Sequence, residues 1–434
     1  MVLSHETGVQ IPVGLPCFNP IIAKNRMKRN LFIILLFFQF YAPKIKAQPN
    51  CDSISKGLPP INDLGMGFWN GYQGGLYPNG SNVRPLSHNS DGLNFASQVE
   101  PLDTLGNPDP NGKIVLLSIG MSNASQESNA FKTIVDTFSQ RNPALIFVNG
   151  AKGGQTASII KDSTAPYWDT VMTRLTNQGL SHLQVQAIWF KEADANPTGV
   201  FPEYAETLHA EFKEIMQILK NEFPNTNLCY HSSRIYGGYA STPLNPEPYA
   251  YHSGWTVKWT IEDQINGDTN LTYAKSPWLS WGPYLWADGL VLRSDSLIWV
   301  CPDDFQSDGT HPSLLGSQKV ANLLLQFFST DETTVPWFLS NPMGIHEDIH
   351  EVIREIKIIP NPFHIRTTVE LPDIIEDGSI DFLLYNLLGR EILKKTQIQN
   401  GSIILNKREL PAGIYFFQVK HENRIIGSGK LIAF

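Results

Sequence analysis

The chain has 434 residues and a formal net charge of −8, with 41 acidic and 33 basic side chains. This balance, with no Lys/Arg runs beyond the amino-terminal region, argues against nucleic acid or an anionic membrane as a partner. The length exceeds that of a typical single domain and predicts two. Beyond the amino-terminal region Cys51, Cys229 and Cys301 remain, an odd number that excludes a fully paired disulfide framework. A Cys51–Cys301 bridge is left open, and Cys229 is predicted to be a buried core residue.

A secretory signal peptide is predicted within residues 1–47. Leu31–Ala42 is an uncharged apolar run, too short to span a bilayer but long enough for the core of a signal peptide. Basic side chains precede this run: Lys24, Arg26, Lys28 and Arg29. We expect cleavage after Ala47, and Met27 is a second candidate for the start of translation. No other stretch is long and apolar enough for a membrane helix, so the mature chain is expected to be exported without a membrane span.

Residues 113–331 are predicted to form an α/β domain. Short apolar runs, typical of buried parallel strands, occur at Ile114–Ile119, Ala144–Val148, Leu183–Phe190 and Asn227–Ser232. Helical spacing of apolar residues predicts one helix at Glu203–Phe223 and another that begins at Pro312. This alternation predicts a three-layer α/β/α sandwich with a central parallel sheet. Active sites in such sheets lie beyond the carboxyl ends of the strands.

Two segments next to these elements are predicted to be irregular. Residues 48–112 are rich in Gly, Asn and Pro and are expected to form a lead-in packed on the α/β domain. Residues 236–299 are aromatic and are expected to fold over the sheet as a long insertion.

The composition changes after the α/β domain. Residues 332–353 are predicted to be a polar linker, and residues 354–434 a small antiparallel β-sandwich of the immunoglobulin-like kind. Short β-rich runs separated by turn signals support this prediction: Ile380–Tyr385, Ser402–Leu405, Ile414–Lys420 and Lys430–Phe434.

This carboxy-terminal region resembles the type A sorting domain of the type IX (Por) secretion system of gliding and oral bacteria. The motifs that carry the resemblance are Ile359–Phe363, Tyr385–Arg390, Leu410–Phe416 and Lys430–Ile432. The resemblance implies that the secretion machinery is a partner and that the chain crosses the outer membrane to the medium or cell surface. An ordinary immunoglobulin-like accessory module is the alternative.

Two short motifs far apart in the chain suggest nucleophilic catalysis. Ser122, in Gly120-Met121-Ser122-Asn123, follows the first predicted strand, where a helix should begin. Asp308 and His311 lie three residues apart before the last helix. A serine attacks a carbonyl carbon efficiently when an imidazole takes its proton and a carboxylate orients that imidazole. The alternatives are a helix cap for Ser122 and a surface turn for the other two residues.

A glycine-containing turn follows the second predicted strand, in Asn149–Thr156. Gly154 in this turn is a candidate oxyanion donor, because glycine lets the backbone approach a ligand closely. The N–H of Ser122, at the start of a helix, is the other candidate donor.

In order along the chain, these motifs resemble the SGNH (GDSL-like) hydrolases, especially the sialate O-acetylesterase and acetylxylan esterase branch, whose fold is flavodoxin-like. The resemblance implies that Ser122 is the nucleophile, Gly154 an oxyanion donor, and Asp308 and His311 the rest of the triad. Met121 stands where the family usually has Asp or Gln. A more serious departure concerns the family's third motif block, which follows the third strand and supplies an amide donor from an asparagine or from Gln-Gly-Glu. Here Trp189–Asp194 holds no amide donor. Lys191, or Asn196 folded back, is a candidate replacement.

The remaining candidates are substrate-binding residues. Arg234 would hold a carboxylate or sugar hydroxyls, or else form an ion pair with Glu192 or Glu247. Glu192, Gln155 and Trp281 are further candidates for substrate contact. Several tryptophans would either stack on sugar rings or build the core of the insertion: Trp255, Trp259, Trp281 and Trp286. Asp303, Asp304 and Asp308 lack the spacing of a calcium loop, so no metal and no cofactor are expected.

These observations lead to the hypothesis of a secreted serine esterase that removes O-acetyl or similar esters from carbohydrates. The rival is a non-catalytic carbohydrate-binding surface protein with the same fold, favoured by the missing third-block amide. Hydrogen-bond reach between Ser122 and His311 would discriminate the two.

Overall fold

The computed structural model describes residues 49–340, 356–370, 380–386, 391–398, 402–421 and 424–433. The predicted signal peptide and most of the predicted linker lie outside these residues, as does the second half of the Tyr385–Arg390 motif. The chain divides into two compact units, residues 1–342 and 343–434.

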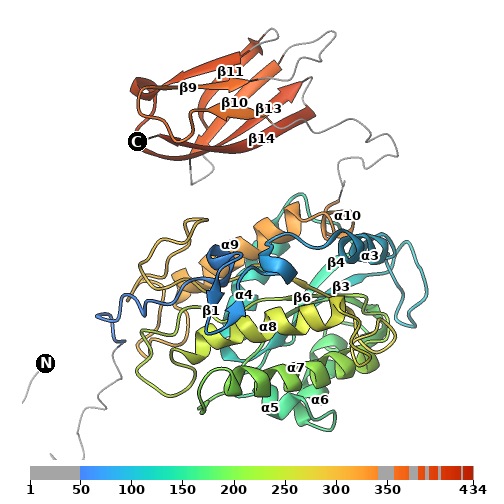
Figure 1. Ribbon diagram of the computed structural model, residues 1–434. Coiled ribbons are helices and arrows are strands. Elements are labelled where there is room, and N and C mark those ends of the chain that lie inside the picture. Colours follow the sequence, from blue (N-terminus) through green and yellow to red (C-terminus); the bar gives the residue numbers. More distant parts are fainter. Residues whose placement is uncertain are drawn as a thin grey trace, which may run out of the picture. The chain divides into compact units, whose positions relative to one another are not determined.

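A five-stranded parallel sheet forms the centre of the first unit (Figure 1). Its strands lie in the order β4 (Leu145–Asn149), β3 (Ile114–Gly120), β5 (Val185–Lys191), β6 (Leu228–His231) and β7 (Trp278–Trp281). Strands β3, β5, β6 and β7 are buried along their whole length, which explains their nearly continuous apolar sequences. The order reverses between β3 and β5, and such a switch point opens a crevice at the carboxyl ends of the strands.

Helices cover both faces of this sheet, which confirms the predicted three-layer α/β/α architecture (Figure 1). One face carries α3 (Leu86–Ser97), α4 (Ser122–Thr137), α9 (Leu314–Thr330) and α10 (Val335–Phe338). The other carries α5 (Ala157–Ile160), α6 (Pro166–Thr176), α7 (Glu203–Glu222) and α8 (Tyr249–Ile265). The smaller elements of this unit are α2 (Ile61–Leu64), β1 (Phe68–Trp69), β2 (Tyr72–Gln73), η1 (Pro78–Gly80) and η2 (His182–Gln184).

The prediction of an irregular insertion at residues 236–299 was wrong. This segment contains α8, a helix of 17 residues, and β7, the fifth strand of the sheet. Most residues of α8 are buried, so its sequence lacks the one-sided apolar spacing that identifies a surface helix. Strand β7 is only four residues long and contains two tryptophans, too little for a periodic pattern.

The lead-in also contains more regular structure than expected. Helix α3 has a polar sequence with a glycine in its middle, and such residues disfavour helices. Tertiary packing compensates for this preference. A Cβ on Gly92 would lie 2.4 Å from the Trp278 ring, so glycine allows α3 to approach β7 closely.

Two predicted boundaries also change. The last large helix begins at Leu314 rather than Pro312, with Ser313 as its N-cap, whose Oγ accepts from the Gly316 N–H at 3.1 Å. The predicted linker starts too early. Helix α10 lies within it, and its Trp337 and Phe338 are buried in the core of the first unit.

The second unit is all-β and antiparallel, as predicted. One sheet has the order β11 (Glu391–Ile398), β10 (Ile380–Asn386), β13 (Gly413–His421) and β14 (Arg424–Ala433). The other has the order β12 (Ser402–Asn406), β9 (Arg366–Glu370) and β8 (Lys357–Ile359), and η3 (Lys407–Glu409) follows β12. Residues from both sheets share one apolar core that includes Val369, Phe382 and Phe417. Within the described part of the chain, no helix is long and apolar enough to cross a membrane.

Candidate active site

Ser122 is the first residue of α4 and follows the carboxyl end of β3, beside the switch point of the sheet. Gly120 makes this sharp strand-to-helix turn sterically feasible. A Cβ there would lie 2.3 Å from the Lys191 carbonyl oxygen and 2.5 Å from the Ala124 Cβ. Only glycine therefore fits between β5 and α4 at this position.

The structure brings the side chains of Ser122, His311 and Asp308 into one hydrogen-bonded chain. Ser122 Oγ lies 2.7 Å from His311 Nε2, and His311 Nδ1 lies 2.5 Å from Asp308 Oδ2. The His311 and Asp308 side chains are 18% and 23% exposed, so the chain is open to solvent at its edge. Met121 is the N-cap of α4 and Ser122 is the first residue inside the helix, which argues against the capping alternative for Ser122.

Hydrogen bonds keep Asp308 ionised. Burial alone would raise the pKa of its carboxyl group. Bonds from the His311 ring and from the backbone N–H groups of His311 and Thr310 outweigh burial and lower the pKa to about 2. An ionised carboxylate at Nδ1 fixes the imidazole tautomer that presents a bare Nε2 to the serine hydroxyl.

Two backbone N–H groups are free to bind an oxyanion near Ser122. The Ser122 N–H lies in the first turn of α4, where no intrahelical acceptor exists. Gly154 is exposed, has φ of +75°, and its N–H donates to no acceptor among the described residues. The neighbouring Gly153 brings this turn close to Ser122, since a Cβ on Gly153 would lie 3.5 Å from the Ser122 Cβ.

Lys191 does not supply the missing third donor. Its Nζ lies 2.5 and 2.6 Å from the two carboxylate oxygens of Glu127 on α4, with both side chains buried. Burial lowers the pKa of Lys191 to about 8, with Glu127 opposing this effect, so the lysine stays protonated at neutral pH. Asn196 does not fold back into the site as a donor, because it is exposed and its side chain has no hydrogen bond to any described residue.

The weaker candidates fall into two groups. Arg234 and Glu192 follow β6 and β5 at the functional edge of the sheet but are 3% and 1% exposed. Neither forms the ion pair expected as an alternative, since no carboxylate lies within 4.0 Å of the Arg234 guanidinium among the described residues. Gln155 is partly exposed beside Gly154, and its side chain makes no hydrogen bond within the described part of the chain.

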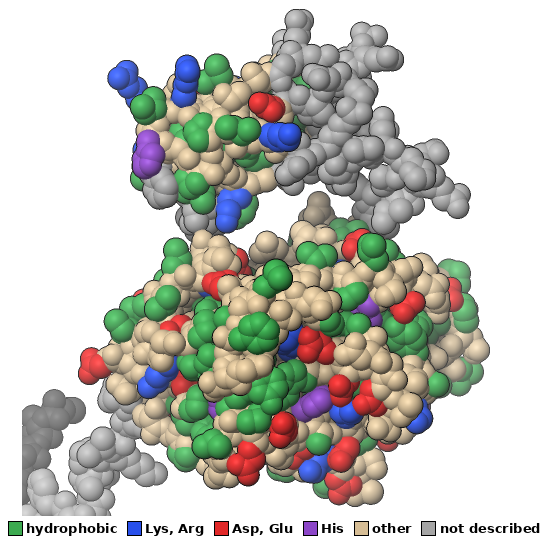
Figure 2. Space-filling model, viewed as in Figure 1, with side chains coloured by type: hydrophobic (Ala, Val, Ile, Leu, Met, Phe, Trp, Pro, Cys, Tyr) green, Lys and Arg blue, Asp and Glu red, His purple; other side chains and the backbone are tan. Residues whose placement is uncertain are grey.

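The tryptophans build the interior rather than a stacking surface. Trp281 is 3% exposed and its Nε1 donates to the Leu76 carbonyl at 2.7 Å, so the prediction of substrate contact was wrong. Trp255 and Trp286 are fully buried, and Trp255 stacks on Trp69 with the ring centroids 5.9 Å apart. Trp259 is partly exposed, and Figure 2 shows hydrophobic side chains gathered over α8 on this face.

A network that the sequence did not suggest holds the loop of Asp308 and His311. Asn123 Nδ2 donates to the Thr310 carbonyl at 2.8 Å and ties this loop to α4. The Ser241 N–H and Oγ donate to the Asp308 carbonyl at 3.0 and 3.2 Å. These contacts join distant segments through backbone carbonyls, which leave no sequence signal.

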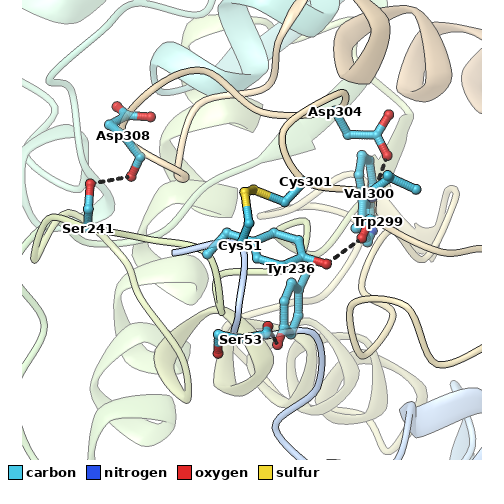
Figure 3. Close-up of a disulfide and its surroundings, with 10 residues drawn as sticks. Cys51, Ser53, Tyr236, Ser241, Trp299, Val300, Cys301, Asp304 and Asp308 are labelled. Carbon is cyan, nitrogen blue, oxygen red and sulfur yellow. Dashed lines mark hydrogen bonds between the residues drawn. A yellow bond between two sulfur atoms is a disulfide. The ribbon is translucent and has the colours of Figure 1, made fainter. Parts of the chain in front are cut away.

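A disulfide fastens the same loop to the start of the described chain. Cys51 and Cys301 form this bridge, and Figure 3 shows it beside the segment that leads to Asp308. The Asn50 N–H donates to the Tyr239 carbonyl at 2.9 Å. Cys229 is free and buried, as expected. No group of three or more His, Cys, Asp or Glu side chains in the described residues is arranged to hold a metal ion.

The second unit has an identifiable family. Residues 357–433 match the model of the secretion system C-terminal sorting domain. This segment is a sorting domain. It directs the chain through type IX secretion to the cell surface or the extracellular space, and the prediction of this partner and destination is confirmed.

Solved structures resemble part of the chain at low identity. The catalytic domain of Streptococcus pneumoniae peptidoglycan O-acetyltransferase A is 12% identical, with 50% of this chain and 94% of that one covered and a TM-score of 0.28. A catalytic mutant of the Geobacillus stearothermophilus acetylxylan esterase Axe2 is 14% identical, with coverages of 50% and 95% and a TM-score of 0.30. An extracellular lipase from Streptomyces rimosus is 12% identical, with coverages of 49% and 99% and a TM-score of 0.27. No curated protein matches the chain.

Proposed function

We propose that this protein is a secreted serine esterase that removes O-acetyl or similar small ester groups from carbohydrates. The observation that carries the proposal is the hydrogen-bonded chain from Ser122 Oγ through His311 to Asp308. Three side chains in these roles and at these distances are what acyl transfer to a serine requires. Export by the sorting domain is consistent with a substrate outside the cell.

In the proposed mechanism His311 Nε2 takes the proton of Ser122 as Oγ attacks the ester carbonyl carbon. The N–H groups of Ser122 and Gly154 donate to the oxygen of the tetrahedral intermediate. His311 then gives the proton to the departing sugar oxygen as the C–O bond breaks. In the second half of the cycle His311 takes a proton from water, whose oxygen attacks the acyl carbon, and returns it to Ser122 Oγ as the acyl–Oγ bond breaks and the free acid leaves. Asp308 holds the imidazolium in place in both halves.

The test compares the wild type with Ser122→Ala on acetylated mono- and oligosaccharides, with acetate release as the readout. We expect kcat to fall by about 10⁶-fold, the order found when a catalytic serine is removed. Ser125→Ala is the matched control, because Ser125 lies one turn further along α4 and does not contact His311. Equal inactivity of the wild type and Ser122→Ala over a broad ester panel would favour the non-catalytic binding protein.

A further inference from the structure

Arg234, in the loop that follows β6, is a buried cation whose side chain has no partner among the residues that the structure describes. Its side chain is 3% exposed, and Nε is enclosed without a hydrogen bond. The two terminal nitrogens also donate to no protein acceptor among the described residues, yet they are not fully enclosed. The tip of the guanidinium therefore faces the small exposed area, and a buried arginine left in this state is unfavourable unless something binds it.

The acidic groups around Arg234 have other partners or an environment that disfavours their charged form. Glu127 is paired with Lys191. Both oxygens of Glu247 accept hydrogen bonds, from the N–H groups of Gly237 and Tyr251 and from Trp286 Nε1. Burial raises the pKa of Glu192 well above its ordinary value, which disfavours the charged form that would pair with Arg234. The charge of Arg234 is thus left without direct compensation.

Further unpartnered polar atoms lie in the two loops that follow β5 and β6. They are Glu192 Oε2, Thr242 Oγ1 and Asn245 Oδ1, all enclosed. The two loops adjoin, because Asn245 Nδ2 donates to the Asp194 carbonyl at 3.1 Å. A concentration of unsatisfied polar atoms at the carboxyl edge of a parallel sheet is typical of a ligand site rather than of a packed core.

The position of Arg234 relative to Ser122 suits one substrate that reaches both. Ser122 follows β3 and Arg234 follows β6, with β5 between them in the sheet. Two strand spacings separate these positions, about 10 Å along the same edge. A planar guanidinium binds a carboxylate through two parallel hydrogen bonds, and this geometry distinguishes a carboxylate from a sugar hydroxyl.

We propose that Arg234 forms a subsite for a carboxylate borne by the substrate, so that the favoured substrate is an ester of an acidic sugar such as a uronic acid. The inference rests on the proposed esterase function, because it places the acidic group beside an ester bound at Ser122. The subsite is a binding element and takes no part in proton transfer.

The experiment uses the wild-type protein and a matched pair of probes, O-acetyl glucuronic acid and O-acetyl glucuronamide. The two differ in one group only, which is a charged carboxylate in the acid and a neutral amide in the other probe. We expect the wild type to favour the acid about ten-fold or more in kcat/KM, mainly through KM, the order of one hydrogen-bonded charge pair. Arg234→Gln should bring the ratio close to one, and Arg234→Lys should retain part of it.

Equal kcat/KM values for acid and amide in the wild type would overturn the subsite, whatever the variants do. A fall of kcat for both probes by the same factor in Arg234→Gln would also overturn it and would assign Arg234 to the reacting centre. Binding of free glucuronate to Ser122→Ala, measured by calorimetry with glucuronamide as control, gives a readout that needs no turnover. Glucuronate binding that depends on Arg234, without hydrolysis by the wild type, would uphold the subsite and reject the esterase.

Discussion

Ser122 and His311 are 189 residues apart in the sequence, yet Ser122 Oγ and His311 Nε2 lie 2.7 Å apart. The parallel sheet makes this proximity possible, because it collects the ends of its strands and their loops at one edge. His311 comes from the loop before α9, and Asn123, next to Ser122, donates to the Thr310 carbonyl of that loop. Asn123, whose side chain joins the two segments, is therefore adjacent in sequence to Ser122, whose hydroxyl His311 contacts.

The carboxylate of Asp308 should stabilise the folded protein only while it is ionised. Its pKa is about 2 in the folded state, below the ordinary value of 3.8, so its contribution is complete above about pH 4 and is lost between pH 4 and 2. We expect Asp308→Asn to be less stable than the wild type at pH 7 by on the order of 1–2 kcal/mol. Denaturant unfolding of both proteins at pH 7, 4 and 2 checks this, since the difference in unfolding free energy should nearly vanish at pH 2. A difference that is independent of pH would contradict the prediction.

Gly154→Ala should impair catalysis through the oxyanion site. No atom lies within 4 Å of the added Cβ, but φ of +75° is strained for alanine, so we expect the turn to rotate and its N–H to move. Loss of one donor lowers kcat by about 10²–10³-fold. Gly179→Ala is the matched control, because Gly179 has φ of +70° with nothing within 4 Å of its Cβ and lies in the turn after α6. Steady-state kinetics should show the lower kcat in Gly154→Ala alone. An equal fall of kcat in Gly179→Ala would indicate general destabilisation instead.

Four of the five strands in the parallel sheet and the order of the three site residues were predictable because each leaves a local pattern. Strands β3 to β6 are short apolar runs in an alternating α/β sequence, and this pattern survives in a single chain. Ser122 alone is also explained as a helix cap, and only its order along the chain with the Gly154 turn and with Asp308 and His311 favours a nucleophile. The geometry that joins it to Asp308 then follows from the parallel topology.

The parts that could not be predicted depend on contacts between distant segments. Strand β7 pairs with β6 only in the folded sheet, and α8 is buried on too many sides to show an amphipathic period. The role of Lys191 was misjudged for a similar reason. Its partner Glu127 lies 64 residues earlier, on a helix whose inward face cannot be identified from charge alone. Burial decides which charged groups are paired, and burial is a property of the fold.

Lys191 and Glu127 should be coupled in stability. Lys191→Met leaves a buried carboxylate unpaired, and we expect it to cost about 3–5 kcal/mol of unfolding free energy. Adding Glu127→Leu should recover most of this loss, because the double variant buries no isolated charge. Lys132→Met is the control on the same helix, since its pair with Asp136 is largely exposed and should contribute only about 0.3–0.5 kcal/mol. Additive losses in the double variant, measured by denaturant unfolding, would contradict the coupling.

The Cys51–Cys301 bridge should stabilise the protein and hold the loop of Asp308 in position. It closes a sequence separation of 250 residues, and removing a bridge typically costs about 2–4 kcal/mol. Cys301 lies seven residues before Asp308 in a loop of turns and irregular backbone, so release of the bridge should also lower kcat. Thermal unfolding and acetate release by the wild type, with and without reductant, test both effects.

Cys51→Ser is the control for the reductant, because it should already show the lower Tm and kcat and should not respond further. A loss of Tm with unchanged kcat would separate the two roles of the bridge: it would then stabilise the fold, while the hydrogen bonds from Ser241 to the Asp308 carbonyl would suffice to hold the carboxylate at His311. If full reduction, verified by thiol titration, changes neither the Tm nor the kcat of the wild type, both roles are rejected.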